Sequence, residues 1–438
     1  MRIGIRREDK NEWERRAPLI PKDVGYLTKK GVEIFLQPSK IRIFPDEAYQ
    51  HAGAVISEDL SPCPFILAVK EIPLDFLEAG KTYLFFSHTL KGQALNMPLL
   101  QKMMELRCQL LDYELVKDEH GRRLIFFGRQ AGQAGMIDTF WALGKRTDWE
   151  GLRTPFSQIM LAHEYESLVE AKSHLSTIAD EIRRDGLPSA MTPLVCGFAG
   201  YGNVSQGAQE IFDLFPNQEI SPSDLALLNF NALSAHKKLF KSVFREQDLV
   251  QPIHPEKPFE LQDYYENPQN YRSRFETYLP HLTVLVNCIY WEPRYPRLVT
   301  LNYLKRAYSA QQPPKLKVIG DISCDIEGSI QCTVKATDPG NPVYVYQPRD
   351  DRIEDSWQGT GPVVMAVDNL PCELAQESSE FFSKVLTPFV PQLAAADYRV
   401  QFENLPLPAE LKRAMILHQG KLTPAFEYLS EFIENEHP

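Results

Sequence analysis

The sequence predicts an α/β protein of two domains. Three observations lead to this class: short apolar runs alternate with helical segments, no internal repeat or low-complexity stretch interrupts them, and the chain has 438 residues, 43% of them hydrophobic. Alternating strands and helices are typical of a sheet covered by helices. A chain of this length exceeds one ordinary hydrophobic core, so two domains are expected.

Charge and cysteine content narrow the class of function. The formal net charge of −11 disfavours a nucleic acid or an anionic membrane as the main partner, since both select a basic surface. The seven cysteines are scattered and contain no C-x-x-C pair, so neither a disulfide framework nor a metal site is expected. No apolar run approaches the roughly 20 residues of a membrane span. We therefore expect a soluble, cytoplasmic protein that acts on small molecules.

The first domain is expected over residues 1–145. Its apolar runs have the length of buried strands, and segments such as PKDVGYLTKKG separate them. These runs are Ile3–Ile5, Val32–Leu36, Phe65–Val69, Tyr83–Phe86 and Gln109–Leu111. The pattern then becomes helical, in GMIDTFWALGK and SQIMLAHEYESLVEAKSHLSTIADEIRR, and residues 146–190 are expected to connect the two domains.

The second domain, residues 191–367, begins with the most explicit motif. The strand Leu194–Phe198 runs into the glycine-rich stretch GYGNVSQGAQEIF. Its turn and helix start contain Gly200, Gly202, Asn203 and Val204. Glycine lets the backbone approach a pyrophosphate, and the helix amino terminus offers N–H groups and a positive dipole end. Ser205 stands where a third glycine is usual, and a small residue is sufficient there for helix packing. The motif predicts a Rossmann-like, dinucleotide-binding domain.

The choice between NAD and NADP is expected to depend on the end of the next strand. If Glu219 ends that strand, its carboxylate favours NAD by binding the ribose hydroxyls. If Ser221 ends it, no acid is present and a 2′-phosphate meets no repulsion. We expect Ser221 at this position and hence a preference for NADP (NADPH), with NAD as the alternative.

The rest of the second domain contains a predicted loop and two further strands. The loop is the polar, Pro- and Tyr-rich stretch 251–274, and the strands lie within residues 281–291 and 315–323. Asp321 and Asp325 lie at and after the end of the second strand. An aspartate in this position either caps a turn or contacts the cofactor.

Neighbouring strands of the first domain end in ionisable residues. The first ends at Lys70 and Glu71, the next at His88 with Lys91 beyond it, and the third at Glu114. Singly, such residues are more often solvated or structural groups. Open α/β sheets bind ligands at the carboxyl ends of their strands, so the convergence of these groups predicts an active site.

Several blocks together resemble one family. They are similar to the lysine–2-oxoglutarate reductase (saccharopine-forming) half of bifunctional α-aminoadipic semialdehyde synthase, within the alanine dehydrogenase/transhydrogenase-like superfamily. The resemblance runs in order from near residue 2 to about residue 435, and extends more distantly to fungal lysine-forming saccharopine dehydrogenase. The blocks are IRREDKNEWERRAPLIPKDV, ILAVKEIP, FFSHTLKGQ, LLDYE, FGRQAGQAGMID, GYGNVSQGAQEIF, NCIYWE, GDISCDIEGSI and VDNLP.

The resemblance implies a reversible reaction of lysine degradation. The ε-amine of lysine attacks 2-oxoglutarate, water leaves, and NADPH reduces the imine to saccharopine. Lys70 and His88 match the acid/base residues of this family, as the proton transfers of such a reaction require. Glu71 and Glu114 match acidic neighbours that hold those pKa values in range.

The resemblance also assigns binding residues. Arg16 matches an arginine that holds a substrate carboxylate, and Lys91 is a second candidate for this contact. Glu71 is also expected to bind substrate. In the second domain, Asp325 matches an aspartate on the nicotinamide side of the cofactor. Asp321 is a further candidate for cofactor binding.

The implied architecture is two Rossmann-like domains with the active site in the cleft between them. The first domain would be discontinuous, residues 1–145 plus 368–438, with VDNLP starting the return to it. The chain ends where a saccharopine-cleaving half would begin, so we expect one activity. A homo-oligomer and a separate glutamate-forming saccharopine dehydrogenase are compatible partners.

Three alternatives remain open at this point. The chain is also compatible with an NAD-dependent, lysine-forming saccharopine dehydrogenase or with an alanine dehydrogenase-like enzyme that uses pyruvate and ammonia. The third alternative is a non-catalytic regulatory protein that binds a dinucleotide.

Overall fold

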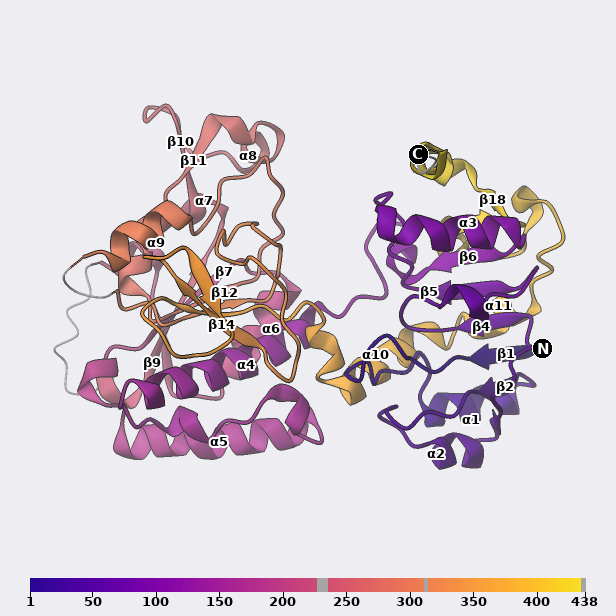
Figure 1. Ribbon diagram of the computed structural model, residues 1–438, viewed down its shortest axis with the longest axis horizontal. Helices are drawn as coiled ribbons and strands as arrows, with labels where there is room; N and C mark the ends of the chain where they lie inside the picture. Colours follow the sequence, from indigo (N-terminus) through magenta and orange to yellow (C-terminus); the bar gives the residue numbers. More distant parts are fainter. Residues whose placement is uncertain (227–234, 311–313, 435–438) are drawn as a thin grey trace. The chain divides into compact units, whose positions relative to one another are not determined.

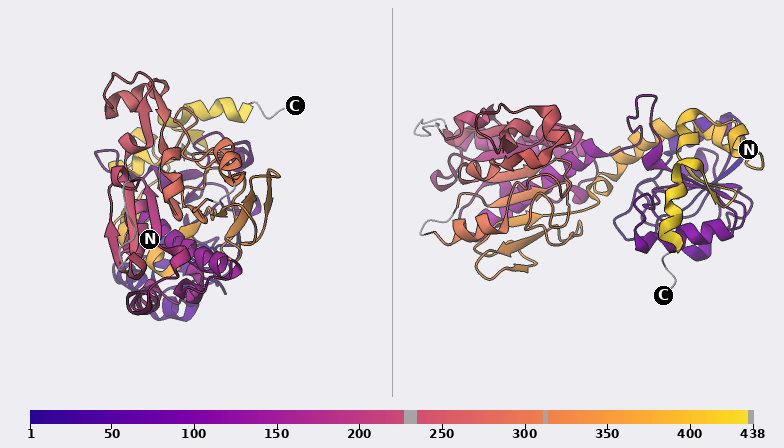
Figure 2. Two further views of the ribbon diagram at one scale, coloured as in Figure 1. Left: turned by 90° about the vertical axis from the view of Figure 1, so that its left-hand side faces the viewer. Right: turned by 90° about the horizontal axis from the view of Figure 1, so that it is seen from above.

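A computed structural model describes residues 1–226, 235–310 and 314–434. The chain divides into two compact units. Unit 1 contains Met1–Phe126 and Ala375–Pro438, and unit 2 contains Phe127–Leu374. Unit 1 is thus built from both ends of the chain, and its indigo and yellow segments lie together in Figures 1 and 2. In the described residues, no helix has both the length and the apolar character needed to cross a membrane.

The boundaries of the units differ from the predicted ones. Unit 2 begins at Phe127, so the helices predicted to connect two domains are part of it. They are α4, Gly128–Trp149, and α5, Leu168–Asp185. Their apolar residues belong to the core that covers one face of the unit 2 sheet, which is why they fold with that unit.

Unit 1 is built on an eight-stranded sheet with the order β18-β17-β6-β5-β4-β1-β2-β3. Strands β1 to β6 pair in parallel, whereas β17 is antiparallel to β6 and to β18. The strands are β1 Arg2–Ile5, β2 Glu33–Leu36, β3 Val55–Ile56, β4 Phe65–Leu67, β5 Thr82–Phe85, β6 Gln109–Asp112, β17 Met415–His418 and β18 Lys421–Leu422. The direction of strand order reverses between β1 and β4, which is where open α/β sheets bind ligands.

Helices from both ends of the chain cover this sheet (Figure 1). They are α1 Pro21–Lys29, α2 Asp46–His51, α3 Met97–Glu105, α10 Ala375–Leu386, α11 Val390–Ala395, α12 Ala409–Arg413 and α13 Ser430–Glu434. Helix α10 returns the chain to unit 1 and holds the segment before α1. Ser379 Oγ accepts a 2.9 Å hydrogen bond from the backbone of Ala17, and Ser383 Oγ accepts a 3.0 Å bond from Ile20. These contacts fix the segment that carries Arg16.

Unit 2 also contains an eight-stranded sheet, with the order β15-β14-β16-β13-β12-β7-β9-β8. From β16 through β13, β12, β7 and β9 to β8, neighbouring strands of this sheet pair in parallel. At the other edge, β14 is antiparallel to both β16 and β15. They are β7 Val195–Ala199, β8 Asn217–Glu219, β9 Leu239–Phe244, β12 Val284–Asn287, β13 Val318–Asp321, β14 Val343–Gln347, β15 Arg352–Glu354 and β16 Val363–Met365. Here the order reverses between β7 and β12.

The stretch predicted as a loop, residues 251–274, contains regular structure. Strands β10, Val250–Pro252, and β11, Tyr271–Ser273, pair there as a small antiparallel sheet, of which this stretch includes all but Val250. Helix α8, Leu261–Glu266, lies between the two strands in sequence. Tyr264 and Tyr271 pack edge to face with ring centroids 5.4 Å apart. The tyrosines that suggested an irregular polar loop thus form a small aromatic core.

Alternate residues of β7 belong to two separate cores. Cys196 and Phe198 lie in the core formed with α4, α5 and α6, whereas Val195 and Ala199 lie in the core on the other face, which includes α9. Successive strand residues point to opposite faces, so burial on both sides explains the continuous apolar run. The remaining helices of unit 2 are α6 Asn203–Phe212, α7 Glu246–Leu249 and α9 Leu301–Tyr308.

Glycines allow α4 and α6 to approach closely. A Cβ added to Gly132 would lie 1.9 Å from the carbonyl oxygen of Val204, and one added to Gly207 would lie 2.1 Å from that of Arg129. Both distances are far below van der Waals contact, so these positions require glycine. The close packing fixes the helix that follows the glycine-rich turn.

A buried pair of carboxyl groups lies between α4 and the end of unit 2. Asp138 and Glu373 interact with each other in the interior, and Asp138 Oδ1 accepts a 2.9 Å hydrogen bond from the backbone of Ala162. His163 Nδ1 lies 3.6 Å from Glu373 Oε2. Burial raises the pKa of both acids, that of Glu373 to about 8. The pair therefore holds a proton at neutral pH.

Candidate active site and cofactor cavity

The carboxylate of Glu8 joins the carboxyl ends of β1 and β4. Its Oε1 accepts a 2.7 Å hydrogen bond from the backbone of Val69, and its Oε2 accepts a 2.9 Å bond from the backbone of Lys70. Burial, with the charge of Glu14 beside it, raises the pKa of Glu8 to about 7. Glu8 was not among the predicted site residues, because an acid inside the charged run IRREDKNEWERR carries no sign of burial.

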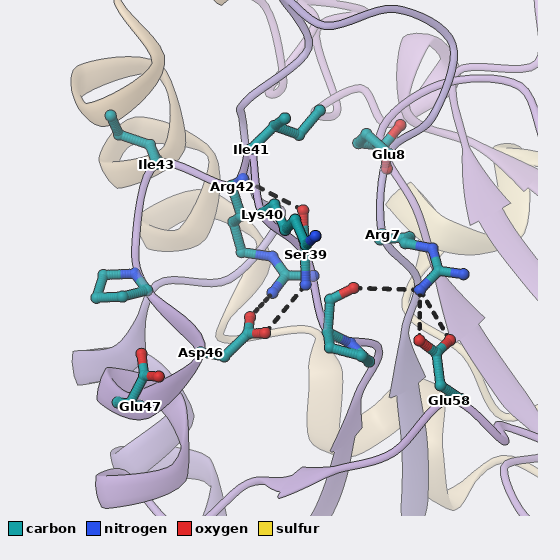
Figure 3. A pocket seen from close by; sticks show the side chains of 12 residues that line it. Arg7, Glu8, Ser39, Lys40, Ile41, Arg42, Ile43, Asp46, Glu47 and Glu58 are labelled. Atoms are coloured by element: carbon teal, nitrogen blue, oxygen red, sulfur yellow. Dashed lines mark hydrogen bonds and ion pairs between the residues drawn. The ribbon is translucent and has the colours of Figure 1, made fainter.

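An open cavity of about 770 Å³ lies beside Glu8 at the ends of β1 and β2 (Figure 3). The arginines that line it are already paired with acids. Arg7 Nη1 lies 2.7 Å from a carboxylate oxygen of Glu58, and Arg42 Nη1 lies 2.6 Å from one of Asp46. The neighbouring carboxylates therefore compensate the charges of these two arginines.

Lys70 has the environment of a lysine poised to lose its proton. Burial lowers its pKa, and the positive charge of Arg16 lowers it further. Within the described residues, its Nζ has no hydrogen-bond partner. A half-buried lysine of lowered pKa at a strand end is a candidate general base.

His88 and Glu71 form a hydrogen-bonded pair next to Lys70. His88 Nδ1 lies 2.6 Å from Glu71 Oε1, and Lys10 Nζ lies 3.0 Å from Glu71 Oε2. Burial acts to raise the pKa of Glu71, but the hydrogen bond to His88 and further donors outweigh it and lower this pKa to about 2. The carboxylate therefore stays ionised and orients the imidazole. The structure thus brings together the predicted residues Lys70, Glu71 and His88.

The backbone of His88 is left-handed. Its φ of 52° lies in a region that is uncommon for residues other than glycine, although asparagine, aspartate and histidine adopt it more often than most. Such conformations persist where surrounding contacts impose them and are common at functional sites. Here Asn96 Nδ2 donates a 2.9 Å hydrogen bond to the His88 carbonyl.

Asp112, at the end of β6, supports the loop that carries His88. Its Oδ2 accepts hydrogen bonds of 2.8 Å from the backbone and 2.5 Å from the hydroxyl of Ser87, and its Oδ1 accepts a 2.7 Å bond from the backbone of Glu114. Asp112 is fully buried, and burial raises its pKa. It stands inside the block LLDYE, where the sequence analysis selected Glu114 instead.

Three other predicted residues have surroundings that modify their expected roles. Arg16 is buried in a two-pronged ion pair with Glu14, with Nε and Nη2 at 2.7 and 2.6 Å from its oxygens, so this edge of the guanidinium is occupied. Glu114 is partly exposed and pairs with Arg123 at 3.1 Å. Lys91 is exposed and forms no ion pair with any described residue.

The glycine-rich turn of unit 2 is suited to a pyrophosphate. Gly200 has a φ of 95°, which favours glycine, and a Cβ added to Gly202 would meet no atom within 4 Å. Open space therefore lies above the turn. Helix α6 begins at Asn203 with no acid in its first turn, so its amide groups and dipole favour an anion. Ser205 is fully buried, as its packing role requires.

A cavity of about 710 Å³ adjoins this turn. Its walls include the predicted cofactor residues Gly200, Gly202, Val204 and Asp325. Residues that follow β12, Cys288 to Trp291, and tyrosines from α8 complete it. The cavity lies at the carboxyl ends of β7 and β12, where the strand order reverses, so it fits a dinucleotide.

Asp321 does not line this cavity. Its carboxylate is fully buried and accepts hydrogen bonds from the side chains of Asn287, at 2.8 Å, and Thr333, at 2.5 Å, and from the backbone of Cys324. Burial raises its pKa to about 6. The assignment of Asp321 to the cofactor is thus corrected: its carboxylate ties β12 to the loop after β13.

The position predicted for Ser221 is also corrected. The strand beside β7 is β9, not β8, and β8 lies at the edge of the sheet. Ser221 follows that edge strand and caps a short 3-10 helix by accepting a hydrogen bond from the backbone of Asp224. The strand next to the glycine turn ends at Phe244 and is followed by Arg245 and Glu246. Because β8 precedes β9 in the chain, the residue after β8 was predicted where the residues after β9 lie.

Comparison with known proteins identifies relatives. Residues 4–134 match the family described as alanine dehydrogenase/PNT, N-terminal domain. The chain is similar to the alpha-aminoadipic semialdehyde synthase of Arabidopsis thaliana, with 40% identity over 98% of this chain and 41% of that protein. It is also similar to the NAD(+), L-lysine-forming saccharopine dehydrogenase of Emericella nidulans, with 26% identity over 90% of this chain and 92% of that protein. The chain spans less than half the length of the semialdehyde synthases that it matches.

A solved structure of L-alanine dehydrogenase has a similar fold. The TM-score is 0.60 at 17% identity, over 99% of this chain and 100% of that chain. The likeness confirms the predicted fold class, α/β with two Rossmann-like domains.

Proposed function

This chain is a homologue of the alpha-aminoadipic semialdehyde synthases and of the lysine-forming saccharopine dehydrogenases, and from this premise we propose that it is a lysine–2-oxoglutarate reductase. Its substrates would be L-lysine and 2-oxoglutarate, and its product saccharopine. The observation that carries the proposal is a lysine of lowered pKa, Lys70, beside an imidazole held by an ionised acid, His88 with Glu71. Condensation of an amine with a ketone requires such a pair of proton-transfer groups.

Lys70 would act first, on the amine of the substrate. The ε-ammonium of lysine must lose a proton before its nitrogen can attack the keto carbon of 2-oxoglutarate. Burial and the charge of Arg16 lower the pKa of Lys70, which increases its neutral fraction and allows it to accept that proton. Attack forms the carbon–nitrogen bond of a carbinolamine.

His88 would act on the oxygen. Donation of a proton to the carbinolamine hydroxyl lets it leave as water and yields the imine. Glu71 holds Nδ1 of the ring, so Nε2 is the nitrogen that would carry this proton to the substrate. Arg16 and Lys91 are the proposed contacts for substrate carboxylates, and Glu114 remains a proposed acidic neighbour.

A nicotinamide dinucleotide would be held by unit 2, at the glycine turn and the adjoining cavity. When bound, it supplies the hydride that reduces the imine carbon to the secondary amine of saccharopine. The expectation of NADP from Ser221 loses its basis, because Ser221 lies outside the residues that line this cavity.

The test is oxidation of the reduced cofactor by the full chain. The absorbance of NADH and, separately, of NADPH is followed in the presence of lysine plus 2-oxoglutarate, and the product is identified by mass spectrometry. Parallel assays contain pyruvate or glyoxylate plus ammonia. Saccharopine formed with the first pair supports the proposal. Turnover with pyruvate and ammonia alone would identify an alanine dehydrogenase-like enzyme, and cofactor binding without any turnover would identify a regulatory protein.

A further inference from the structure

The carboxyl-terminal segment of unit 1 packs on the loop that follows β5. In this loop the backbone of Gly92 donates a 3.0 Å hydrogen bond to the Thr89 carbonyl, which closes a turn with Lys91 near its tip. The hydroxyl of Tyr428 donates a 2.7 Å hydrogen bond to the carbonyl of Leu90, in the same turn. Segments 338 residues apart in sequence are thereby joined within one unit.

The ring of Phe432, in α13, makes a second contact with the turn. Gly92 has a φ of 61°, in the left-handed region that favours glycine. A Cβ added there would lie 2.3 Å from the Phe432 ring, so the ring rests directly on the backbone of Gly92. Lys91 therefore lies between two residues that the carboxyl-terminal segment contacts, Leu90 and Gly92.

The carboxyl-terminal segment is itself fixed to unit 1. Leu429, between the two aromatic residues in sequence, is fully buried. Gln101, in α3, donates a 3.1 Å hydrogen bond to the Ile433 carbonyl, so α3 and α13 lie together (Figure 1). Tyr428 and Phe432 themselves are 43% and 40% exposed, so replacing either leaves the core of unit 1 intact.

His88, in the same loop, has separate support. The buried Asp112 accepts hydrogen bonds from Ser87, and Asn96 donates one to the His88 carbonyl. The contacts of the carboxyl-terminal segment lie farther along the loop, around Lys91. Because the Lys91 side chain is exposed and forms no ion pair with any described residue, its placement depends on its backbone.

We propose that Tyr428 and Phe432 are positioning residues, which fix the turn that presents the Lys91 ammonium to a substrate carboxylate. The inference rests on the proposed function in assigning that carboxylate to Lys91. A lysine side chain is long and flexible, and a backbone that is already fixed lowers the entropy lost when the ammonium binds. The dianion 2-oxoglutarate is the substrate that this contact favours most. The two aromatic residues thus act on substrate affinity, through Lys91.

Hydrogen–deuterium exchange of the full chain, without substrate, measures the turn directly. Tyr428→Phe removes only the hydroxyl, and Phe432→Ala removes the ring. In each variant the peptide that covers residues 89–93 should exchange about threefold to tenfold faster than in the wild type, because a lost contact makes local opening easier. Phe432→Leu keeps an apolar side chain against Gly92 and should restore most of the protection. Peptides from β5 and from unit 2 should exchange at the wild-type rate.

Steady-state kinetics separate substrate affinity from chemistry. With saturating L-lysine, Tyr428→Phe and Phe432→Ala should each raise KM for 2-oxoglutarate about threefold to tenfold and change kcat by less than about twofold. Lys91→Met should raise the same KM at least as much. In the Lys91→Met background, Tyr428→Phe should have no further effect on this KM, because both residues act through one ammonium group.

Tyr26→Phe is the matched control, since Tyr26 is an exposed tyrosine of α1 in the same unit, and it should alter neither exchange nor KM. Wild-type exchange of the turn in both test variants would overturn the inference, whatever the reductase assay gives. So would a lower kcat at unchanged KM, or an effect of Tyr428→Phe that persists in the Lys91→Met background. Faster exchange of the turn in a protein without turnover would refute the proposed function and leave the support of the turn in place.

Discussion

The backbone amide of Lys70 lies 2.9 Å from the carboxylate of Glu8, across the point where the strand order of unit 1 reverses. The same carboxylate accepts the amide of Val69, so one buried acid positions the end of β4. Because Glu8 acts through the backbone of Lys70, it is a positioning residue for the proposed base.

Glu8→Gln should therefore weaken both the fold and the reaction. The side-chain amide of glutamine keeps one acceptor oxygen but points its N–H donors at a backbone N–H. This mismatch should lower the free energy of unfolding by about 1–3 kcal/mol. The melting temperature should fall by roughly 2–6 °C, and kcat by about tenfold. Glu12→Gln, an exposed acid in the same charged run, is the matched control and should change neither. Unaltered melting and turnover in Glu8→Gln would exclude the positioning role.

Removal of the titratable amine at position 70 should stop the proton transfer. Lys70→Met and Lys70→Arg should each reduce kcat by on the order of 10²-fold or more, since arginine keeps the charge but does not release its proton. Dinucleotide binding, measured by fluorescence, should be preserved. Lys102→Met, at a partly exposed lysine of α3, is the control. Wild-type turnover in Lys70→Arg would show that a fixed positive charge is sufficient and that Lys70 is not the base.

The pH dependence should carry the signature of Lys70. The proposed base must be neutral to act, and its pKa lies below the usual lysine value. We therefore expect kcat/KM to rise with pH along an acid limb whose midpoint lies below 10.5, the ordinary value for lysine. Residual activity of Lys70→Met should lack this limb. If the pH profile of Lys70→Met keeps an acid limb with the same midpoint, this limb belongs to a group other than Lys70.

Two substitutions at position 88 separate the role of the imidazole from that of the left-handed backbone. His88→Ala and His88→Asn both remove the imidazole, but asparagine tolerates the φ of 52° better than alanine does. Both variants should lose on the order of 10²-fold in kcat, while His88→Asn should have the higher melting temperature. Recovery of turnover in His88→Asn would indicate that the backbone, not the ring, is required.

The candidate active site could be predicted from the sequence because its signals are local. Lys70 and His88 each follow a short apolar run, and the end of a buried parallel strand places a side chain at the ligand-binding edge. The glycine turn before α6 was found in the same way. In each case a pattern within about ten residues specifies both the element and its end.

Contacts between distant segments could not be predicted in this way. The order of β8 and β9 depends on which strand pairs with β7, and no residue of either strand encodes that choice by itself. Ser221 was therefore selected, although it follows the edge strand β8. Likewise, nothing in GDISCDIEGSI distinguishes the buried Asp321 from Asp325, which lines the cavity, because the partners of Asp321 include residues on other segments.

The buried pair of Asp138 and Glu373 should make the protein less stable as pH rises. An ordinary glutamate has a pKa near 4.5, whereas burial raises that of Glu373 to about 8. Between these values the folded chain binds a proton that the unfolded chain has lost, so the free energy of unfolding decreases as pH increases.

Glu373→Gln removes this contribution. Between pH 5 and pH 9, roughly the window of this shift, the melting temperature of Glu373→Gln should fall less with rising pH than that of the wild type. At the alkaline end of this range, the variant should have the higher melting temperature. Scanning fluorimetry across this range would measure both curves. Glu119→Gln, at an exposed acid, should follow the wild-type curve. Parallel curves for Glu373→Gln and wild type would show that Glu373 does not bind this proton in the folded state.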